Sequence, residues 1–371
     1  MSSPDLLKAE TLATSGKFVD AEIAYAKAIY SSRGPVVFNR YGDFLKRAGR
    51  LSEAQSMYEN ALKFELPTDK RALADSHRKL GDVFLIRGEI SQAEREYQEA
   101  LSVDQSMQDE RGLADDHRAL GRLANAKGNF ADAESHFLKA LELDIKLGAF
   151  QSVAKDKGSL GLVSLGRRDF ENAEQMFRSA LQINEEHNWR DGIARDSGNL
   201  GLALKGRGDL EGALELQKRA LDIHSELGDI EGMASSHGIL GIIYLERGDL
   251  ANAETHLHSA SQLDDQLGRL AGVAQANEYL ADVYQMKGNF KVAEECVRKA
   301  LKIYERSEDV VSLARAYEKL GLLYGHTGAT ESARAIWLFA RELYLKSGLD
   351  MDSQRIDHLL GSQLQRSSDS R

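Results

Sequence analysis

The chain has 371 residues, of which 42% are hydrophobic and 29% charged, so it can bury a core and is not a disordered polymer. Its 48 Lys and Arg against 58 Asp and Glu give a formal net charge of −10, which argues against a general nucleic-acid binder. The single cysteine excludes an intrachain disulfide framework, and no apolar run approaches the roughly 18 residues of a membrane span.

The predicted elements begin with two short helix pairs, at about 2–33 and 35–68. Each pair carries glycine, alanine, tyrosine and alanine at the same relative positions: Gly16, Ala21, Tyr25 and Ala28, then Gly49, Ala54, Tyr58 and Ala61. All three prolines lie in this part of the chain. The long remainder without proline is typical of uninterrupted helices.

From residue 74 onward the sequence repeats every 40 residues. A Leu-Gly pair recurs at 80–81, 120–121, 160–161, 200–201, 240–241, 320–321 and 360–361, with Leu280-Ala281 in the remaining copy. A turn glycine such as Gly88 follows, replaced once by Arg168, and then two alanines flank a bulky residue on one helical face. Each repeat is therefore predicted to be helix, tight turn, helix, tight turn. Seven such repeats are predicted at 74–110, 114–150, 154–190, 194–230, 234–270, 274–310 and 314–350.

The last predicted element is a helix at 351–365, followed by a disordered tail at 366–371. Its apolar residues lie on one face: Ile356, Leu359, Leu360 and Leu364. Repeat arrays need a terminal helix that covers the last apolar surface. We therefore expect this segment to cap the array, which spans 1–350.

These motifs resemble the tetratricopeptide repeat, which has Leu-Gly in the first helix and Ala-x3-aromatic-x2-Ala in the second. The 40-residue step and Asn199-Leu200-Gly201 resemble its Leu-Gly-Asn class, found in Pins-like adaptors. The resemblance implies an all-α fold. It implies a right-handed α-solenoid, a superhelix of nine helix-turn-helix repeats closed by the capping helix.

The resemblance also implies that a variable stripe along the first helices lines a concave ligand-binding groove. The candidate groove residues are Arg78, Arg118, Arg122, Asn125, Lys155, Gly158, Leu162, Leu165, Arg195, Gly198, Asn199, Leu202, Lys205, Gly238, Ile242, Leu245, Glu278, Asp282 and Glu318. Three helix-interior glycines share one column of the stripe, Gly158, Gly198 and Gly238, at a cost of roughly 1 kcal/mol each relative to alanine. Room for a ligand backbone explains them, but so do tight internal packing and occupation by the protein's own C-terminal segment.

Other polar and aromatic residues give weaker signals. His77, His117 and His237 fall in one column and are expected to pack rather than bind metal. Trp189, in a turn, is either a contact residue or packed on the adjacent helix. No phosphate-binding loop, nucleophile elbow or zinc-protease motif is present.

The sequence therefore predicts a non-enzymatic, cytoplasmic interaction scaffold without cofactor or metal. Its expected partner is a protein or peptide, with no nucleic acid and no membrane span, and the chain itself is expected to be a monomer or weak homodimer. The alternative is a regulatory tetratricopeptide protein that acts on a signalling enzyme or response regulator. A subunit that self-assembles through its ends is a third possibility.

Overall fold

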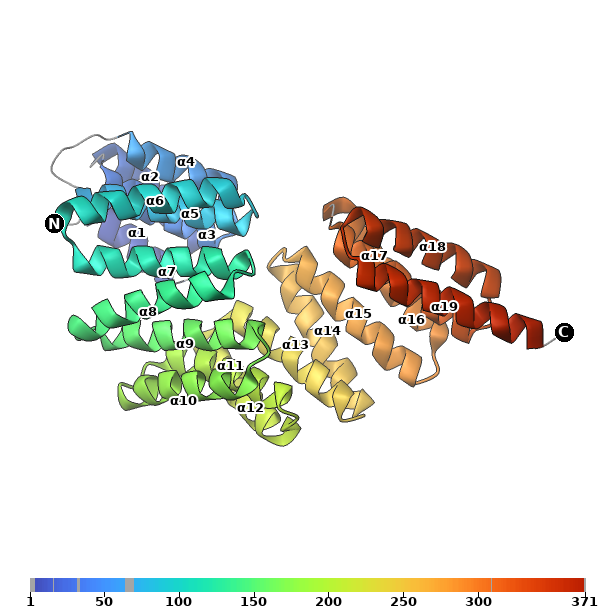
Figure 1. Ribbon diagram of the computed structural model, residues 1–371. Helices are drawn as coiled ribbons and strands as arrows, with labels where there is room; N and C mark the ends of the chain where they lie inside the picture. Colours follow the sequence, from blue (N-terminus) through green and yellow to red (C-terminus); the bar gives the residue numbers. More distant parts are fainter. Residues whose placement is uncertain (1–3, 16, 32–33, 64–69, 308, 370–371) are drawn as a thin grey trace. The chain divides into compact units, whose positions relative to one another are not determined.

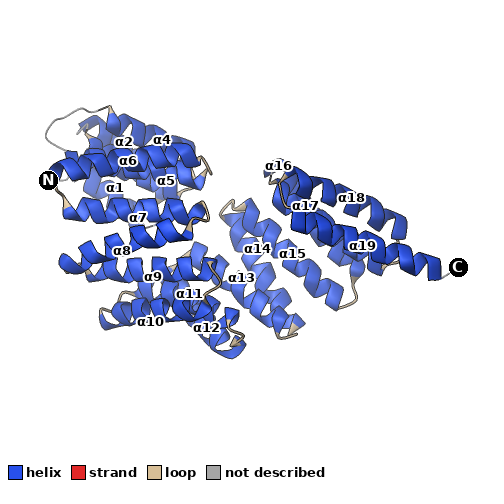
Figure 2. Ribbon diagram, in the orientation of Figure 1, coloured by secondary structure: helices blue, strands red, loops and turns tan. Residues whose placement is uncertain are grey.

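The computed structural model describes residues 4–369 except 16, 32–33, 64–69 and 308, and it gives no side-chain burial for Thr14 and 362–369. This part of the chain consists of nineteen α-helices and the turns between them, with no strand (Figure 2). The helices follow one another as nine pairs and a final single helix (Figure 1). The predicted all-α solenoid of nine repeats and a terminal helix is confirmed.

The chain divides into two compact bodies, here called the N-terminal body (Met1–Ala203) and the C-terminal body (Leu204–Arg371). The N-terminal body contains α1 (Pro4–Thr14), α2 (Phe18–Ser31), α3 (Pro35–Arg47), α4 (Leu51–Leu62), α5 (Lys70–Ile86), α6 (Ile90–Met107), α7 (Glu110–Ala126), α8 (Phe130–Lys146), α9 (Phe150–Gly166), α10 (Phe170–Glu186) and most of α11 (Arg190–Gly206). The C-terminal body contains the end of α11, α12 (Leu210–Leu227), α13 (Ile230–Glu246), α14 (Leu250–Gln266), α15 (Leu270–Met286), α16 (Phe290–Ser307), α17 (Val310–His326), α18 (Thr330–Lys346) and α19 (Asp350–Asp369).

The turn inside each regular repeat needs a residue in the left-handed region. Gly88 has a φ of +75°, and its neighbour Glu89 donates from its backbone nitrogen to the carbonyl of Phe84 at 2.8 Å. Arg168 takes the same conformation with a φ of +61°. A left-handed non-glycine residue costs about 1–2 kcal/mol. The turn at Arg168, where the sequence departs from the glycine column, is therefore locally strained.

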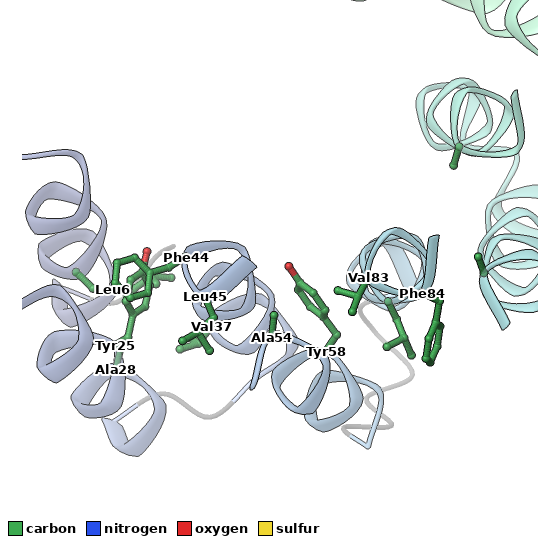
Figure 3. Close-up of a cluster of buried hydrophobic side chains, with 14 of the residues drawn as sticks. Leu6, Tyr25, Ala28, Val37, Phe44, Leu45, Ala54, Tyr58, Val83 and Phe84 are labelled. Carbon is green, nitrogen blue, oxygen red and sulfur yellow. The ribbon is translucent and has the colours of Figure 1, made fainter. Parts of the chain in front are cut away.

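The Leu-Gly column packs against the bulky residue of the second helix. A Cβ atom on Gly81 would lie 2.5 Å from Cε1 of Tyr97, and one on Gly161 would lie 2.6 Å from Cε1 of Phe177. Only glycine allows the two helices of a repeat to approach this closely. The aromatic rings then fill the core, as Tyr25 and Tyr58 do in the first two repeats (Figure 3).

The final helix packs on the ninth repeat. Ile356 of α19 is 0% exposed and belongs to a cluster with Trp337 and Tyr344. The helix continues to Asp369, beyond the expected end at 365, so the expected tail is helical as far as that residue. The side chain of Leu364 and residues 370–371 lie outside the described part of the chain.

Candidate functional site

The variable stripe lies on the first helix of each repeat, and three of its predicted groove residues line a hollow: Arg78 in the N-terminal body, and Glu278 and Glu318 in the C-terminal body. The hollow of the N-terminal body has a volume of about 540 Å³, and Asp75, Arg78 and Asp115 are among its lining residues. The hollow of the C-terminal body has about 510 Å³, and Glu278 and Glu318 are among its lining residues. The apolar middle of the stripe, including Leu162 and Gly238, is not part of the lining of these two hollows.

Two arginines of the stripe are held in internal ion pairs. Nη1 of Arg78 donates to Oδ2 of Asp104 at 2.5 Å and to Oδ1 of Asp116 at 2.7 Å. Forty residues later, Nε of Arg118 donates to Asp156 at 2.8 Å and Nη2 donates to Asp144. The two arginine side chains are only 15% and 12% exposed. Both guanidinium groups therefore join neighbouring helices and are poorly placed for a ligand.

Each of these arginines faces two buried aspartates. Burial raises the pKa of Asp116 and that of Asp156 to about 7, although the adjacent guanidinium groups partly oppose this shift. One guanidinium cannot neutralise two carboxylates that are removed from water. The second carboxyl group of each cluster is therefore partly protonated near neutral pH.

Gly158 occupies the position that Arg78 and Arg118 occupy in the two preceding repeats. The repeat after Gly158 supplies an arginine from another position, Arg195. Asp196, which is 0% exposed, occupies the same position as Asp116 and Asp156. It accepts from Nδ2 of Asn184 at 2.6 Å and from Nε of Arg195 at 3.0 Å. Burial raises the pKa of Asp196, and Arg195 lowers it. A guanidinium group is thus restored to this cluster from a different helical position.

At two glycines of this column, Gly158 and Gly238, an added Cβ atom would overlap no neighbour. A Cβ atom on Gly158 would meet only Oδ1 of Asp196, at 3.4 Å, and one on Gly238 would meet only Cβ of Ala260, at 3.9 Å. These are ordinary contacts, unlike the overlap found at Gly161. A Cβ atom would therefore fit at both positions in ordinary van der Waals contact, although Gly158 is buried and Gly238 is partly buried.

The other predicted residues of the N-terminal body differ in exposure. Arg122 is 44% exposed and pairs with Asp82 at 2.5 Å. Lys155 is exposed, and Leu162 is 42% exposed. Partly buried residues complete the set: Asn125, Leu165, Gly198, Asn199 and Leu202. The exposed members of the predicted set in this body are thus two cations and one leucine, whereas Gly158 is buried.

In the C-terminal body, most acidic and basic stripe residues already have partners. Lys205 pairs with Glu246 at 2.8 Å, and Asp282 accepts from Lys319 at 2.8 Å. Glu278 accepts from Tyr304 at 2.9 Å. The apolar stripe residues of this body, Ile242 and Leu245, are partly buried, as is Gly238.

Glu318 is 8% exposed and is held by α19. Its carboxylate accepts from Nε of Arg355 at 2.8 Å, from Nη2 of Arg355 at 2.6 Å, and from Tyr344 at 2.8 Å. The capping helix therefore uses a predicted ligand-binding carboxylate as its own attachment point. Arg355 was not expected at the groove.

The aspartates that bind Arg78, Arg118 and Arg195 were also not predicted from the sequence. They recur in two columns at steps of 40 residues: Asp104 and Asp144 in one, and Asp116, Asp156 and Asp196 in the other. Polar residues that recur like core residues indicate a buried polar network. This recurrence is the signal that could have revealed them.

The histidine column forms pairs between the two helices of a repeat. Nδ1 of His117 lies 3.1 Å from Nδ1 of His136, and Nδ1 of His237 lies 2.9 Å from Nδ1 of His256. Burial lowers the pKa of His117 and that of His256 to about 4. Among the described residues there is no group of three or more His, Cys, Asp or Glu that could hold a metal ion.

Trp189 has an aromatic neighbour within its own turn. Its ring stacks on His187 at 4.4 Å between centroids, and His187 in turn lies 5.4 Å from the ring of Phe150. The Trp189 ring is partly exposed and its stacking partner lies two residues earlier in the chain, so the choice between packing on the adjacent helix and a ligand contact stays a prediction. Within the part of the chain that the structure describes, no helix is both long and apolar enough to cross a membrane.

The paired helices and their glycine-aromatic contacts match a known repeat family. A family model described as the MalT-like TPR region matches residues 150–354, more than half of the chain. The chain belongs to this family. Two further tetratricopeptide models match residues 35–106 and 78–147, so the predicted tetratricopeptide repeats are confirmed. No match was found among curated protein sequences.

Solved structures share the fold of this MalT-like TPR chain at low identity. A Rap protein complexed with Competence and Sporulation Factor has a TM-score of 0.62 at 14% identity, covering 91% of this chain and 99% of that one. Aspartyl phosphate phosphatase F from Bacillus subtilis has a TM-score of 0.60 at 13% identity, covering 91% and 92%. A signal-transduction ATPase with a tetratricopeptide sensor, from Pyrococcus horikoshii, has a TM-score of 0.56 at 15% identity, covering 88% and 48%.

Proposed function

We propose that this protein is a non-enzymatic interaction scaffold that binds a peptide segment of a partner protein along the stripe of first helices. The observation that carries the proposal is the loose surroundings of partly buried Gly238, where an added Cβ atom would meet only Cβ of Ala260, at 3.9 Å. A helix-interior glycine costs about 1 kcal/mol relative to alanine, and at Gly238 no neighbour is close enough to require glycine. A ligand backbone that approaches the helix closely supplies the missing reason.

The chemistry of the stripe fits a peptide. Exposed Leu162 can contact an apolar side chain of the peptide, whereas the cationic and acidic residues on either side set the position of the peptide along the stripe. The proposal leaves out Arg78, Arg118 and Glu318, because their charged groups are held by other parts of the chain. Membership of the Leu-Gly-Asn class, a cytoplasmic location and a monomeric or weakly dimeric state belong to the same proposal.

A second candidate function is regulation of a signalling enzyme or response regulator. It is favoured by the likeness to a Rap protein and to an aspartyl phosphate phosphatase over about nine-tenths of this chain. In this alternative the same stripe, or another face, contacts a receiver domain. The test is whether the purified chain accelerates loss of the aspartyl phosphate from a phosphorylated receiver domain. Unchanged phosphate lifetime would reject this function and leave the scaffold proposal intact.

The scaffold proposal is tested with Gly238→Leu. Leucine favours the helix by about 0.8 kcal/mol over glycine, and the added Cβ atom would meet only Cβ of Ala260, at 3.9 Å, so we expect the variant to fold; thermal unfolding checks this before binding is compared. It should also block a ligand that needs this space. Partners are first captured from extracts of the native cell and identified by mass spectrometry, and their affinity for the variant is then measured with purified components.

The control is Ala251→Leu, which adds the same side chain at an exposed position on the second helix of the repeat. We expect Gly238→Leu to abolish or sharply weaken binding and Ala251→Leu to leave it unchanged. Equal binding by both variants would remove the stripe from consideration. Unfolding of Gly238→Leu would show that this glycine serves internal packing.

A further inference from the structure

Helix α2, in the first repeat, has an apolar outer face. Val19, Ile23 and Tyr30 are 74%, 53% and 86% exposed, and Ala26 between them is also exposed. These four residues, here called the α2 seam, are spaced 4, 3 and 4 apart, so they follow one side of the helix for about 17 Å. The residues that join α2 to the core are buried on its other sides: Ala21, Ala24, Tyr25 and Ala28. The seam therefore contributes little to the packing of its own repeat.

The other repeats show that this face does not have to be apolar. In repeat three the four equivalent positions hold Ser91, Arg95, Gln98 and Ser102. Each of the eight later repeats has at least two polar or charged residues at these positions, whereas the first repeat has three aliphatic residues and a tyrosine. The second helices share the same buried alanine columns, so internal packing does not explain the difference. A contiguous exposed apolar face is typical of an interaction surface.

The spacing of the seam is that of a short coiled-coil stripe, which pairs with a second stripe of the same kind. If two copies of α2 lie antiparallel about a twofold axis, Val19 lies opposite Tyr30 of the second copy. Ile23 then lies opposite Ala26. Each layer thus combines a larger with a smaller side chain, which allows the two helices to interdigitate.

Charged residues beside the seam favour this antiparallel arrangement. Asp20 and Lys27 are exposed, lie seven residues apart on one flank, and have no ion pair among the described residues. In antiparallel pairing, Asp20 of each copy lies beside Lys27 of the other, so both charges are paired twice. In parallel pairing, Lys27 would instead face Glu22, whose carboxylate already accepts from Arg50 at 2.8 Å. Asp20 would then face no cation.

We propose that the α2 seam is a self-association surface on which a second copy of this chain docks, with the two α2 helices antiparallel about a twofold axis. The occupant is a second copy because the apolar layers and the flanking charges are complementary to themselves in this arrangement. Such an isologous contact closes after two copies and leaves no surface for a third. The seam lies on a second helix, whereas the stripe lies on the first helices, so this association is independent of peptide binding.

Sedimentation velocity of the purified full chain measures this association. Concentrations from about 1 to 200 μM are needed, because a contact of this small size is weak. Ile23→Glu places a carboxylate in the middle of the seam on both copies. The matched control is Ser135→Glu, because Ser135 is exposed at the equivalent position of repeat four. Circular dichroism and thermal unfolding establish that each variant keeps the fold before association is compared.

Charge reversals test the antiparallel arrangement itself. Asp20→Lys alone and Lys27→Asp alone each bring like charges together twice in an antiparallel dimer. The double variant, Asp20→Lys with Lys27→Asp, brings opposite charges together again. In a parallel dimer the double variant would not restore association, because Lys27→Asp would add a carboxylate beside Glu22.

We expect the wild type to form a concentration-dependent dimer, which Ile23→Glu weakens at least about tenfold and Ser135→Glu leaves unchanged. Each single reversal should weaken association several-fold, as for exposed ion pairs formed twice, and the double variant should restore it. A wild type that stays monomeric, or a dimer that survives Ile23→Glu, refutes the proposal. A monomer that instead co-sediments with phosphatidylcholine vesicles would assign the seam to a membrane surface. Failure of the double variant to associate refutes the antiparallel arrangement. None of these results bears on peptide binding, which Gly238→Leu tests separately.

Discussion

Two glycines on α9, three residues apart, should respond in opposite directions to the same substitution. A Cβ atom on Gly158 would meet a single atom at 3.4 Å, whereas one on Gly161 would meet three atoms of the Phe177 ring at 2.6, 2.8 and 2.8 Å. Gly158→Ala therefore adds a methyl group to available space. Gly161→Ala forces the aromatic ring or the helix to move.

The magnitudes follow from these contacts. Alanine is favoured over glycine in a helix interior by about 0.5–1 kcal/mol, so Gly158→Ala should stabilise the protein by about that amount. Overpacking a well-filled core costs about 1–3 kcal/mol. After the same gain in helix propensity, Gly161→Ala should be destabilising by about 1–2 kcal/mol. The two variants should therefore differ by roughly 2 kcal/mol in the free energy of unfolding.

Urea unfolding followed by far-ultraviolet circular dichroism measures this difference, provided that both variants keep the wild-type dependence on urea. Gly238→Ala and Gly241→Ala repeat the comparison in the C-terminal body. There the added Cβ would lie 3.9 Å from Ala260 in one case and 2.6 Å from Leu257 in the other.

The reasoning would be refuted if Gly158→Ala and Gly161→Ala destabilised the protein equally. That result would mean that both glycines serve internal packing, and the argument from the stripe glycines to a ligand would lose its basis. Equal stabilisation would mean instead that the Phe177 ring moves aside without cost.

Four further outcomes are expected. Arg168→Gly should stabilise the protein by about 1 kcal/mol in urea unfolding, because glycine relieves the φ of +61°; no gain would mean that the turn is not strained. Burial raises the pKa of Asp116 to about 7, so its contribution to stability is fully present below about pH 4 and is lost as the pH rises through 7; Asp116→Asn should therefore be more stable than wild type at about pH 8 and similar at about pH 4, and an equal difference at both pH values would contradict this. Burial lowers the pKa of His256 to about 4, so its contribution is present above about pH 6.5 and is lost as the pH falls toward 4; His256→Glu, which copies the His–Glu pair of the third repeat, should lose less stability on acidification, and an unchanged pH profile would show that this histidine does not cause the loss of stability at low pH. Ile356→Ala should lower the free energy of unfolding by about 2–4 kcal/mol, whereas a smaller loss would show that α19 is only loosely attached.

The helical pairs could be predicted because the same physical requirement recurs in every repeat. The glycine opposite a bulky ring, such as Gly161 opposite Phe177, leaves a regular mark in the sequence since each copy packs in the same way. The turn at Arg168 was also visible as an exception in a glycine column. The end of α19 was harder to place, because nothing beyond residue 365 repeats an earlier pattern.

The site was predicted less well than the fold. Periodicity shows on which helix face a residue lies, but it does not show which group a long side chain contacts. Arg78 and Arg118 do lie on the stripe, yet each reaches sideways to carboxylates 26 and 38 residues away. Glu318 likewise lies on the stripe and is covered by Arg355. Helical phase alone cannot distinguish these residues from Arg195, because the difference depends on which partner the neighbouring helix supplies.

The alternation of arginine and aspartate between successive repeats limits how this gene can change length. Loss of one 40-residue repeat after Asp104 would bring Arg78 opposite Asp156 in place of Asp116, and the cluster would form again. Loss of the sixth repeat would delete Asp196 together with Arg195 and would leave Asn184 facing Ser236. We therefore expect loss of a repeat to preserve the buried ion pairs where successive copies carry matching charges, and to leave a buried polar group without its partner where they do not.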